Sequence, residues 1–192
     1  MIRIAVVGDI GSGKSHVARQ LGYPVFNADF EVAKLYKKSR KCYNKLKQTL
    51  PNYITSFPVK KSKLSEAIIT NQNNIKKIIK VIHPEIRLKM KDFIRKNRNK
   101  KFIVLDIPLL LENRINKKND ILIFVDAKKK EINKRLQKRL NTNFKIIKKF
   151  KKFQLPVEIK KRKSDFIIKN NFNNNSIKKN VKRVMKKILL NA

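Results

Sequence analysis

Three of the four glycines in this sequence fall within one eight-residue stretch, which reads G-D-I-G-S-G-K-S. The loop residues of this stretch are Gly8, Gly11, Ser12 and Gly13. Glycines let the backbone curl so that consecutive N–H groups point inward at phosphate oxygens. We expect Lys14 to reach the β- and γ-phosphates of a nucleotide and the Ser15 hydroxyl to bind Mg²⁺. The spacing therefore predicts a site for nucleotide phosphates and Mg²⁺.

The residues that flank this loop supply the strand and the helix that it requires. The apolar run Ile2–Val7 precedes the loop, and Val17, Ala18 and Leu21 follow it at helical spacing. The alternative is an ordinary glycine-rich turn, which the agreement between motif and context disfavours. A carboxylate that faced the phosphates would repel them, so the prediction requires Asp9 to point away.

Five short apolar runs recur along the chain, each followed by a segment with helical periodicity. The runs are Ile2–Val7, Pro24–Asn27, Phe102–Asp106, Ile121–Asp126 and Asp165–Ile168. Several lack alternating polar residues, as strands buried on both faces do. Strands that alternate with helices predict an α/β fold with a doubly wound, five-stranded parallel sheet. Ligands of such sheets bind at the carboxyl ends of the strands.

The chain length of 192 residues predicts a single domain over residues 1–192. Residues from about 30 to 98 contain no clear strand and predict a helical insertion. The stretches Lys128–Arg139 and Asn143–Lys152 predict two basic helices. A polar loop at Asn170–Asn175 precedes the last predicted helix, Ile177–Leu190, which we expect Ser176 to cap.

The sequence holds 50 Lys and Arg against 13 Asp and Glu, a net charge of +37. Such a balance suggests a nucleic acid or an acidic membrane as partner. However, the excess is mostly lysine, spreads along the whole chain and accompanies abundant Asn and Ile, which share A/T-rich codons. We therefore interpret it as a solvated surface that attracts polyanionic nucleotides, with nucleic-acid binding at most nonspecific.

The cysteine count and the lengths of the apolar runs indicate the compartment in which the protein is expected. Cys42 is the single cysteine, so no intrachain disulfide forms. No apolar run approaches the roughly 20 residues that cross a bilayer, and Met1 opens directly into the first predicted strand without a signal peptide. We expect a cytoplasmic protein with no membrane partner, as a monomer or a small homo-oligomer.

Two acidic residues stand where predicted strands end. Asp29, just after the second strand, could accept a proton from an acceptor hydroxyl or orient it, or could cap a helix. Asp106, after four apolar residues, could hold a water of the Mg²⁺ shell, or could again be a cap. In the segment that follows, Pro108 fixes a turn, and Glu112 could lie on a solvated face.

Basic candidates are less specific in so basic a chain. His83 stands before a proline, and Arg87 could pair with a phosphate, but a lone histidine is more often structural. Arg135 and Arg139 are four residues apart and share one helix face, where two guanidinium groups could neutralise the charge of a triphosphate. The alternative is an ordinary basic helix face.

Taken together, these stretches resemble the dephospho-CoA kinase family, nearly end to end. The segments that carry the resemblance are Gly8–Ser15, Pro24–Asp29, His83–Arg87, Asp106–Glu112, Val125–Ala127, the pair Arg135 and Arg139, Gln154, and Ser164–Ile168. The sequence departs from the family pattern at Asp9, usually glycine, and at Ser15, often threonine. After Asn170 and Asn171 the family's glycine is missing, which leaves adenine binding without a prediction.

The resemblance implies a fold of the P-loop kinase type and a phosphotransferase with an alcohol acceptor. It implies that the γ-phosphoryl group of ATP goes to the ribose 3′-hydroxyl of dephospho-CoA, giving coenzyme A and ADP. Asp29 would activate or orient that hydroxyl, while Lys14 and the two arginines stabilise the transferring group. The acceptor-side residues it implies are Asp29, His83, Arg87, Asp106 and Pro108. The helical insertion would bind the acceptor, and residues 128–153 would form a lid.

Two other functions remain open at this point. Another small-molecule P-loop kinase would keep the phosphate-binding loop but has no reason to carry the segments around His83 and Asp106 together. A nucleic-acid-binding P-loop ATPase would need basic residues clustered on one face with interleaved aromatic side chains. The lysines are instead diffuse, and the aromatic residues lie mostly in apolar segments.

Overall fold

The computed structural model describes residues 1–138 and 143–190, and its chain divides into two compact units. The first unit comprises Met1–Asn27, Asn97–Thr142 and Lys151–Ala192, and the second comprises Ala28–Lys96 and Asn143–Phe150. Each unit has a core of its own and is described by itself.

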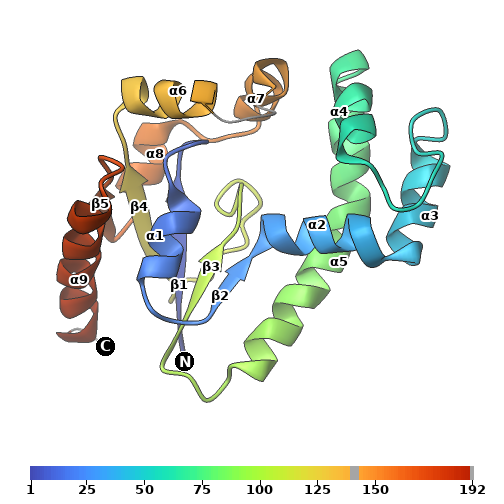
Figure 1. The fold of residues 1–192 in the computed structure, drawn as a ribbon. Helices are drawn as coiled ribbons and strands as arrows, with labels where there is room; N and C mark the ends of the chain where they lie inside the picture. The colour runs from blue at the N-terminus through green and yellow to red at the C-terminus, as the bar shows by residue number, and fades with distance from the viewer. Residues whose placement is uncertain (139–142, 191–192) are drawn as a thin grey trace. The chain divides into compact units, whose positions relative to one another are not determined.

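A five-stranded parallel sheet forms the centre of the first unit (Figure 1). Its strands are β1 (Ile2–Gly8), β2 (Val25–Asn27), β3 (Phe102–Asp106), β4 (Ile121–Asp126) and β5 (Phe166–Lys169). Their spatial order is β2-β3-β1-β4-β5. From β1 the chain passes to the edge strand β2 and returns to β3 beside β1. It then crosses to the other side of β1 and forms β4 and β5. This confirms the predicted doubly wound α/β fold and places the end of β1 at the point where the winding reverses.

The central strands β1, β3 and β4 are buried on both faces, as their continuous apolar sequences require, whereas the edge strand β5 leaves Ile167 exposed. On one face, Ile4 and Val6 pack in a cluster with Val17 of α1 (Lys14–Gln20) and Val181 of α9 (Asn174–Leu190). The intervening residues of β1 point to the opposite face, since side chains alternate along a strand. There α8 (Val157–Arg162) packs against β1. Two layers of helices therefore hold the strand that carries the phosphate-binding loop.

The last helix begins earlier than the sequence indicates. It starts at Asn174, and Ser176 lies inside its first turn. The backbone N–H of Ser176 donates to Asn173 Oδ1 at 3.1 Å, so Asn173 supplies the side chain that caps the helix. The prediction that Ser176 is the cap is wrong because three neighbouring asparagines offer equally good capping side chains.

The second unit is helical. Its helices are α2 (Ala28–Lys38), α3 (Arg40–Thr49), α4 (Lys61–Thr70), α5 (Asn73–Lys96) and α7 (Phe144–Lys151), whose last residue belongs to the first unit. The long helix α5 packs against α2, α3 and α4. Lys149 of α7 donates to the carbonyl oxygens of Ile68 and Ile69, both at 2.8 Å. Carbonyls in the last turn of a helix lack partners within it, so this lysine attaches α7 to the end of α4.

Cys42 reports on the packing of this helical unit. Its side chain is fully buried in α3, and burial raises the pKa of its thiol to about 11, with a further contribution from the Glu85 carboxylate. Because the thiolate is the reactive form, we expect a thiol reagent at pH 8 to label the native protein at least roughly 100-fold more slowly than the urea-unfolded protein. Equal rates would show that α3 is not packed as described.

Candidate active site

The loop between β1 and α1 folds around Ser12, whose side chain is fully buried. Its Oγ has no hydrogen-bond partner among the described residues. A Cβ atom on Gly8 would lie 2.8 Å from this Oγ and 2.9 Å from the carbonyl oxygen of Val125, so only glycine fits there. A buried hydroxyl without a partner is costly. A loop that holds a buried hydroxyl without a hydrogen-bond partner suits an oxygen-rich ligand such as a phosphate group.

Lys14 and Asp9 bring opposite charges to this loop. The Lys14 Nζ atom donates to the carbonyl oxygens of Asp9, at 2.8 Å, and Gly8, at 3.4 Å, which holds the ammonium group over the loop. The Asp9 carboxylate accepts the N–H of Ile10 at 2.6 Å and lies 3.9 Å from Lys151 Nζ. A neighbouring lysine thus offsets the charge of the one acidic residue in the loop.

Gly13 is the loop position where a side chain would clash most severely with its surroundings. It caps α1 with φ at +90°, and a Cβ atom there would collide with the Asn170 amide. That amide donates to the carbonyl oxygen of Ser12 at 2.7 Å, which ties the loop to the segment after β5.

We expect Gly13→Ala to weaken ATP binding by at least about tenfold and to lower the melting temperature more than Gly22→Ala does. Gly22 is the matched control because its φ of +79° imposes a similar backbone strain while nothing lies within 4 Å of its Cβ position. Calorimetric titration and thermal melting measure both effects. Equal behaviour of the two variants would contradict the close contact with Asn170.

Asp106 ends β3 beside the end of β2. Its carboxylate is buried and accepts a hydrogen bond from the Asn27 side-chain amide, since the two residues are register partners. Among the described residues, no three His, Cys, Asp or Glu side chains come close enough to share a metal ion. Mg²⁺ favours few protein ligands and keeps several waters. The Ser15 hydroxyl and the Asp106 carboxylate are the kinds of donor that such a site uses, with phosphate oxygens and waters as the other ligands.

The segment after Asp106 is fixed by a buried ion pair. Pro108 stands in the turn that follows β3, and Leu109 after it has φ at +58°. Glu112 pairs with Lys160 of α8 at 2.8 Å and accepts the N–H of Leu155 at 2.9 Å. Its side chain is 11% exposed, so the expectation of a solvated face is wrong. The segment is thereby anchored to α8.

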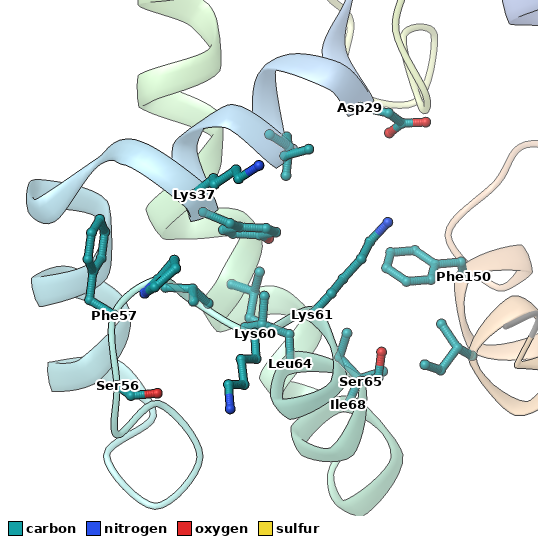
Figure 2. A pocket seen from close by; sticks show the side chains of 17 residues that line it. Asp29, Lys37, Ser56, Phe57, Lys60, Lys61, Leu64, Ser65, Ile68 and Phe150 are labelled. Carbon is teal, nitrogen blue, oxygen red and sulfur yellow. The ribbon is translucent and has the colours of Figure 1, made fainter.

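A pocket of about 650 Å³ lies within the second unit, and Asp29 lines it (Figure 2). Because α2 begins at Ala28, Asp29 lies in the first turn of the helix rather than at the capping position. The walls are mainly apolar and come from α2, α4, α5, α7 and the segment before α4. They include Val32, Tyr36, Phe57, Leu64, Ile68, Ile146 and Phe150.

Carboxylate, ammonium and hydroxyl groups line this pocket. Lys37 and Lys61 line it, and Figure 2 shows the long side chain of Lys61 extending toward the edge where Asp29 lies. Burial raises the pKa of the Tyr36 phenol, with further contributions from Cys42 and from the Asp29 carboxylate. Tyr36 is therefore a neutral hydroxyl at any physiological pH. The pocket combines a carboxylate, ammonium groups and a phenol with an apolar floor.

His83 and Arg87 both lie on α5, in the same unit as the pocket, but neither is part of its lining. His83 is half-buried, and burial followed by the charge of Arg87 lowers its pKa. The imidazole is therefore neutral at pH 7. Arg87 is exposed.

Arg135 lies on α6 (Lys129–Lys138), with its guanidinium 4.9 Å from the centre of the Phe172 ring. Together with Glu131, Lys134 and Lys138 these two residues line a cavity of about 480 Å³ in the first unit. Arg139, the second predicted arginine, lies outside the described residues.

Sequence reasoning missed several residues of these sites. The lining of the large pocket, including Tyr36, Lys61 and Phe150, gives no signal in the sequence beyond helical periodicity. Asn170 and Phe172 lie where the sequence departs from the family pattern, and that departure is the one signal in the sequence that indicates them.

The described residues include no helix long and apolar enough to cross a membrane.

Comparison with known proteins agrees with this geometry. The family model for dephospho-CoA kinase matches residues 2–179. A dephospho-CoA kinase of Bartonella quintana is 35% identical over 86% of this chain and 87% of its own length. That of Bartonella henselae is 34% identical over 98% of both chains.

Solved structures agree in fold. A Thermus thermophilus protein aligns with a TM-score of 0.79 at 24% identity, covering 99% of this chain and 97% of its own. A dephospho-CoA kinase from Campylobacter jejuni aligns with a TM-score of 0.62 at 23% identity, covering 97% and 96%. The chain matches the family model, has relatives more than 30% identical to it along most of its length, and carries a phosphate-binding loop at the switch point of its sheet. This chain is therefore a kinase that belongs to the dephospho-CoA kinase family.

Proposed function

We propose that this chain transfers the γ-phosphoryl group of ATP to the ribose 3′-hydroxyl of dephospho-CoA, giving coenzyme A and ADP. The observation that carries the choice of acceptor is the pocket of the helical unit, which combines Asp29, lysines and apolar walls. Dephospho-CoA has matching parts: a ribose hydroxyl to be activated, a pyrophosphate to be neutralised, and a long arm with little charge. This supports a large acceptor over a nucleoside or a simple sugar.

Asp29 is the residue that we assign to the acceptor hydroxyl. Its carboxylate accepts the hydroxyl proton, or holds the hydroxyl in line with the transferring group, as the oxygen attacks phosphorus. Lys37 and Lys61 neutralise the acceptor's phosphates, and the apolar residues of α4 and α7 cover its arm. We also assign His83, Arg87, Asp106 and Pro108 to the acceptor side.

The nucleotide belongs to the first unit. The loop N–H groups, Ser12 and Lys14 hold the β- and γ-phosphates, and Arg135 and Arg139 neutralise the charge on the transferring group. Ser15 and, through water, Asp106 would hold Mg²⁺, which when bound supplies charge neutralisation at the phosphate oxygens. Transfer requires the loop and the Asp29 pocket to come together around both substrates, and residues 128–153 serve as the lid.

The other candidate functions have weaker support. The nucleic-acid alternative rests on the net charge, which is spread along the whole chain rather than concentrated in one segment. We therefore interpret the charge of +37 as composition that speeds nucleotide encounter, most strongly at low salt. A monomeric or small oligomeric state and a cytoplasmic location stay predictions.

The test is Mg²⁺-dependent ADP release from ATP with a panel of acceptors. Dephospho-CoA is the proposed acceptor, and adenosine, other nucleosides and RNA are the controls. We expect turnover with dephospho-CoA and only background release with the others. ATP hydrolysis stimulated by RNA, without turnover of any small acceptor, would favour the nucleic-acid alternative instead.

A further inference from the structure

Phe172 adopts a backbone conformation that its side chain disfavours. It stands between β5 and α9 with φ at +62°, in the left-handed region that glycine and asparagine occupy readily. Asparagines precede and follow it, yet the bulky residue holds the strained position. A strained backbone at the edge of a ligand site persists only where its surroundings determine it, and it often serves the site.

Two hydrogen bonds fix this conformation to the phosphate-binding loop. The Phe172 N–H donates to Asn170 Oδ1 at 2.8 Å, and the same Asn170 amide donates from its nitrogen to the carbonyl oxygen of Ser12 at 2.7 Å. The Cβ position of Gly13 lies 3.5 Å from Phe172 Cε1. The edge of the ring is thus set directly against the residue that precedes Lys14.

The face of the same ring carries Arg135. The guanidinium carbon lies 4.9 Å from the ring centre, within the range of a cation–π contact. A guanidinium is planar, and its five N–H donors point outward in its plane. A face that rests on an aromatic ring therefore leaves these donors available for phosphate oxygens, in the cavity that Arg135 and Phe172 line.

We propose that Phe172 is a positioning residue for Arg135: the strained loop presents the aromatic ring so that the guanidinium is held beside the phosphate-binding loop before ATP arrives. An arginine side chain that is free in solution loses much conformational entropy when it binds a ligand. An arginine already held in place loses less, so the ring improves ATP affinity without touching ATP. This inference rests on the proposed role of Arg135.

The test is a double-mutant cycle on binding of a non-hydrolysable ATP analogue, measured by calorimetry without acceptor. Phe172→Leu removes the aromatic face and keeps an apolar side chain. Phe172→Asn also removes it and relieves the strain, and Phe172→Tyr keeps the ring. We expect the first two variants to bind the analogue roughly three- to tenfold more weakly and the tyrosine variant to bind as wild type does. Leu190→Ala, at an exposed leucine at the end of α9, is the control and should have no effect.

The second half of the cycle repeats Phe172→Leu in an Arg135→Ala background. If the ring acts through Arg135, the substitution changes affinity less than about 1.5-fold there. An equal loss in both backgrounds, tighter binding by Phe172→Leu, or no loss in either non-aromatic variant would overturn the proposal. Because the readout needs no acceptor, absence of turnover with dephospho-CoA would contradict the proposed function and leave this test intact.

Discussion

Replacing Lys14 with alanine is expected to lower the turnover number by at least about 100-fold while the protein stays folded. The ammonium group lies over the loop carbonyls. There we expect it to meet the negative charge of the β- and γ-phosphates. We expect its loss to remove stabilisation from the transferring group, whereas the fold loses contacts at a partly exposed loop. Steady-state kinetics and a thermal melt of the variant measure both quantities.

The matched control is Lys100→Ala, which makes the same change in net charge at an exposed lysine before β3. It should retain wild-type turnover, because the general field of so basic a chain barely changes. Full turnover by the Lys14 variant would contradict the assignment of the loop, and a loss in both variants would show that overall charge matters more than position.

Replacing Asp29 with asparagine should cost far more in turnover than in ATP affinity. The amide cannot accept the acceptor's proton, and loss of general base catalysis costs about 100- to 10,000-fold. We have assigned the nucleotide's phosphates to residues of the other unit, so ATP affinity should change less than about threefold. The comparison needs the turnover number with dephospho-CoA and the affinity for ATP measured separately.

Glu31→Gln is the control for this variant. Glu31 also lies in the first turn of α2, where it pairs with Lys34 at 3.0 Å on the surface, and its neutralisation removes the same charge from the same helix end. Normal turnover in that variant, with a large loss in Asp29→Asn, would separate chemistry from helix stability. An unchanged turnover number in Asp29→Asn would show that Asp29 only stabilises the start of α2.

The sequence predicts the sheet well because its strands are short, continuous apolar runs, and only a fully buried parallel strand needs such a run. The strand β5 begins one residue later than predicted, at Phe166 rather than Asp165, whose side chain instead accepts the N–H of Leu122 at 2.8 Å. The phosphate-binding loop is predicted because its function depends on local backbone geometry, which residues close in sequence determine.

Features that depend on distant residues are not predicted. The pair of Glu112 and Lys160 joins residues far apart in the sequence, and nothing near either residue indicates it. The pocket beside Asp29 arises where five segments meet, so helical periodicity shows only that Leu64 and Ile68 are apolar. Phe172 adopts a left-handed backbone conformation that a bulky residue disfavours. The sequence shows that the family's glycine is missing near this point, but local preference does not predict that Phe172 adopts such a conformation.

The most direct test of the whole account is the position of the phosphate in the product. Wild-type protein is incubated with ATP, Mg²⁺ and dephospho-CoA, and the product is isolated and analysed by mass spectrometry and ³¹P NMR. The account predicts one added phosphate, on the ribose 3′-oxygen, with one ADP formed per product. A phosphate on any other oxygen, or ADP formed without a phosphorylated acceptor, would contradict it.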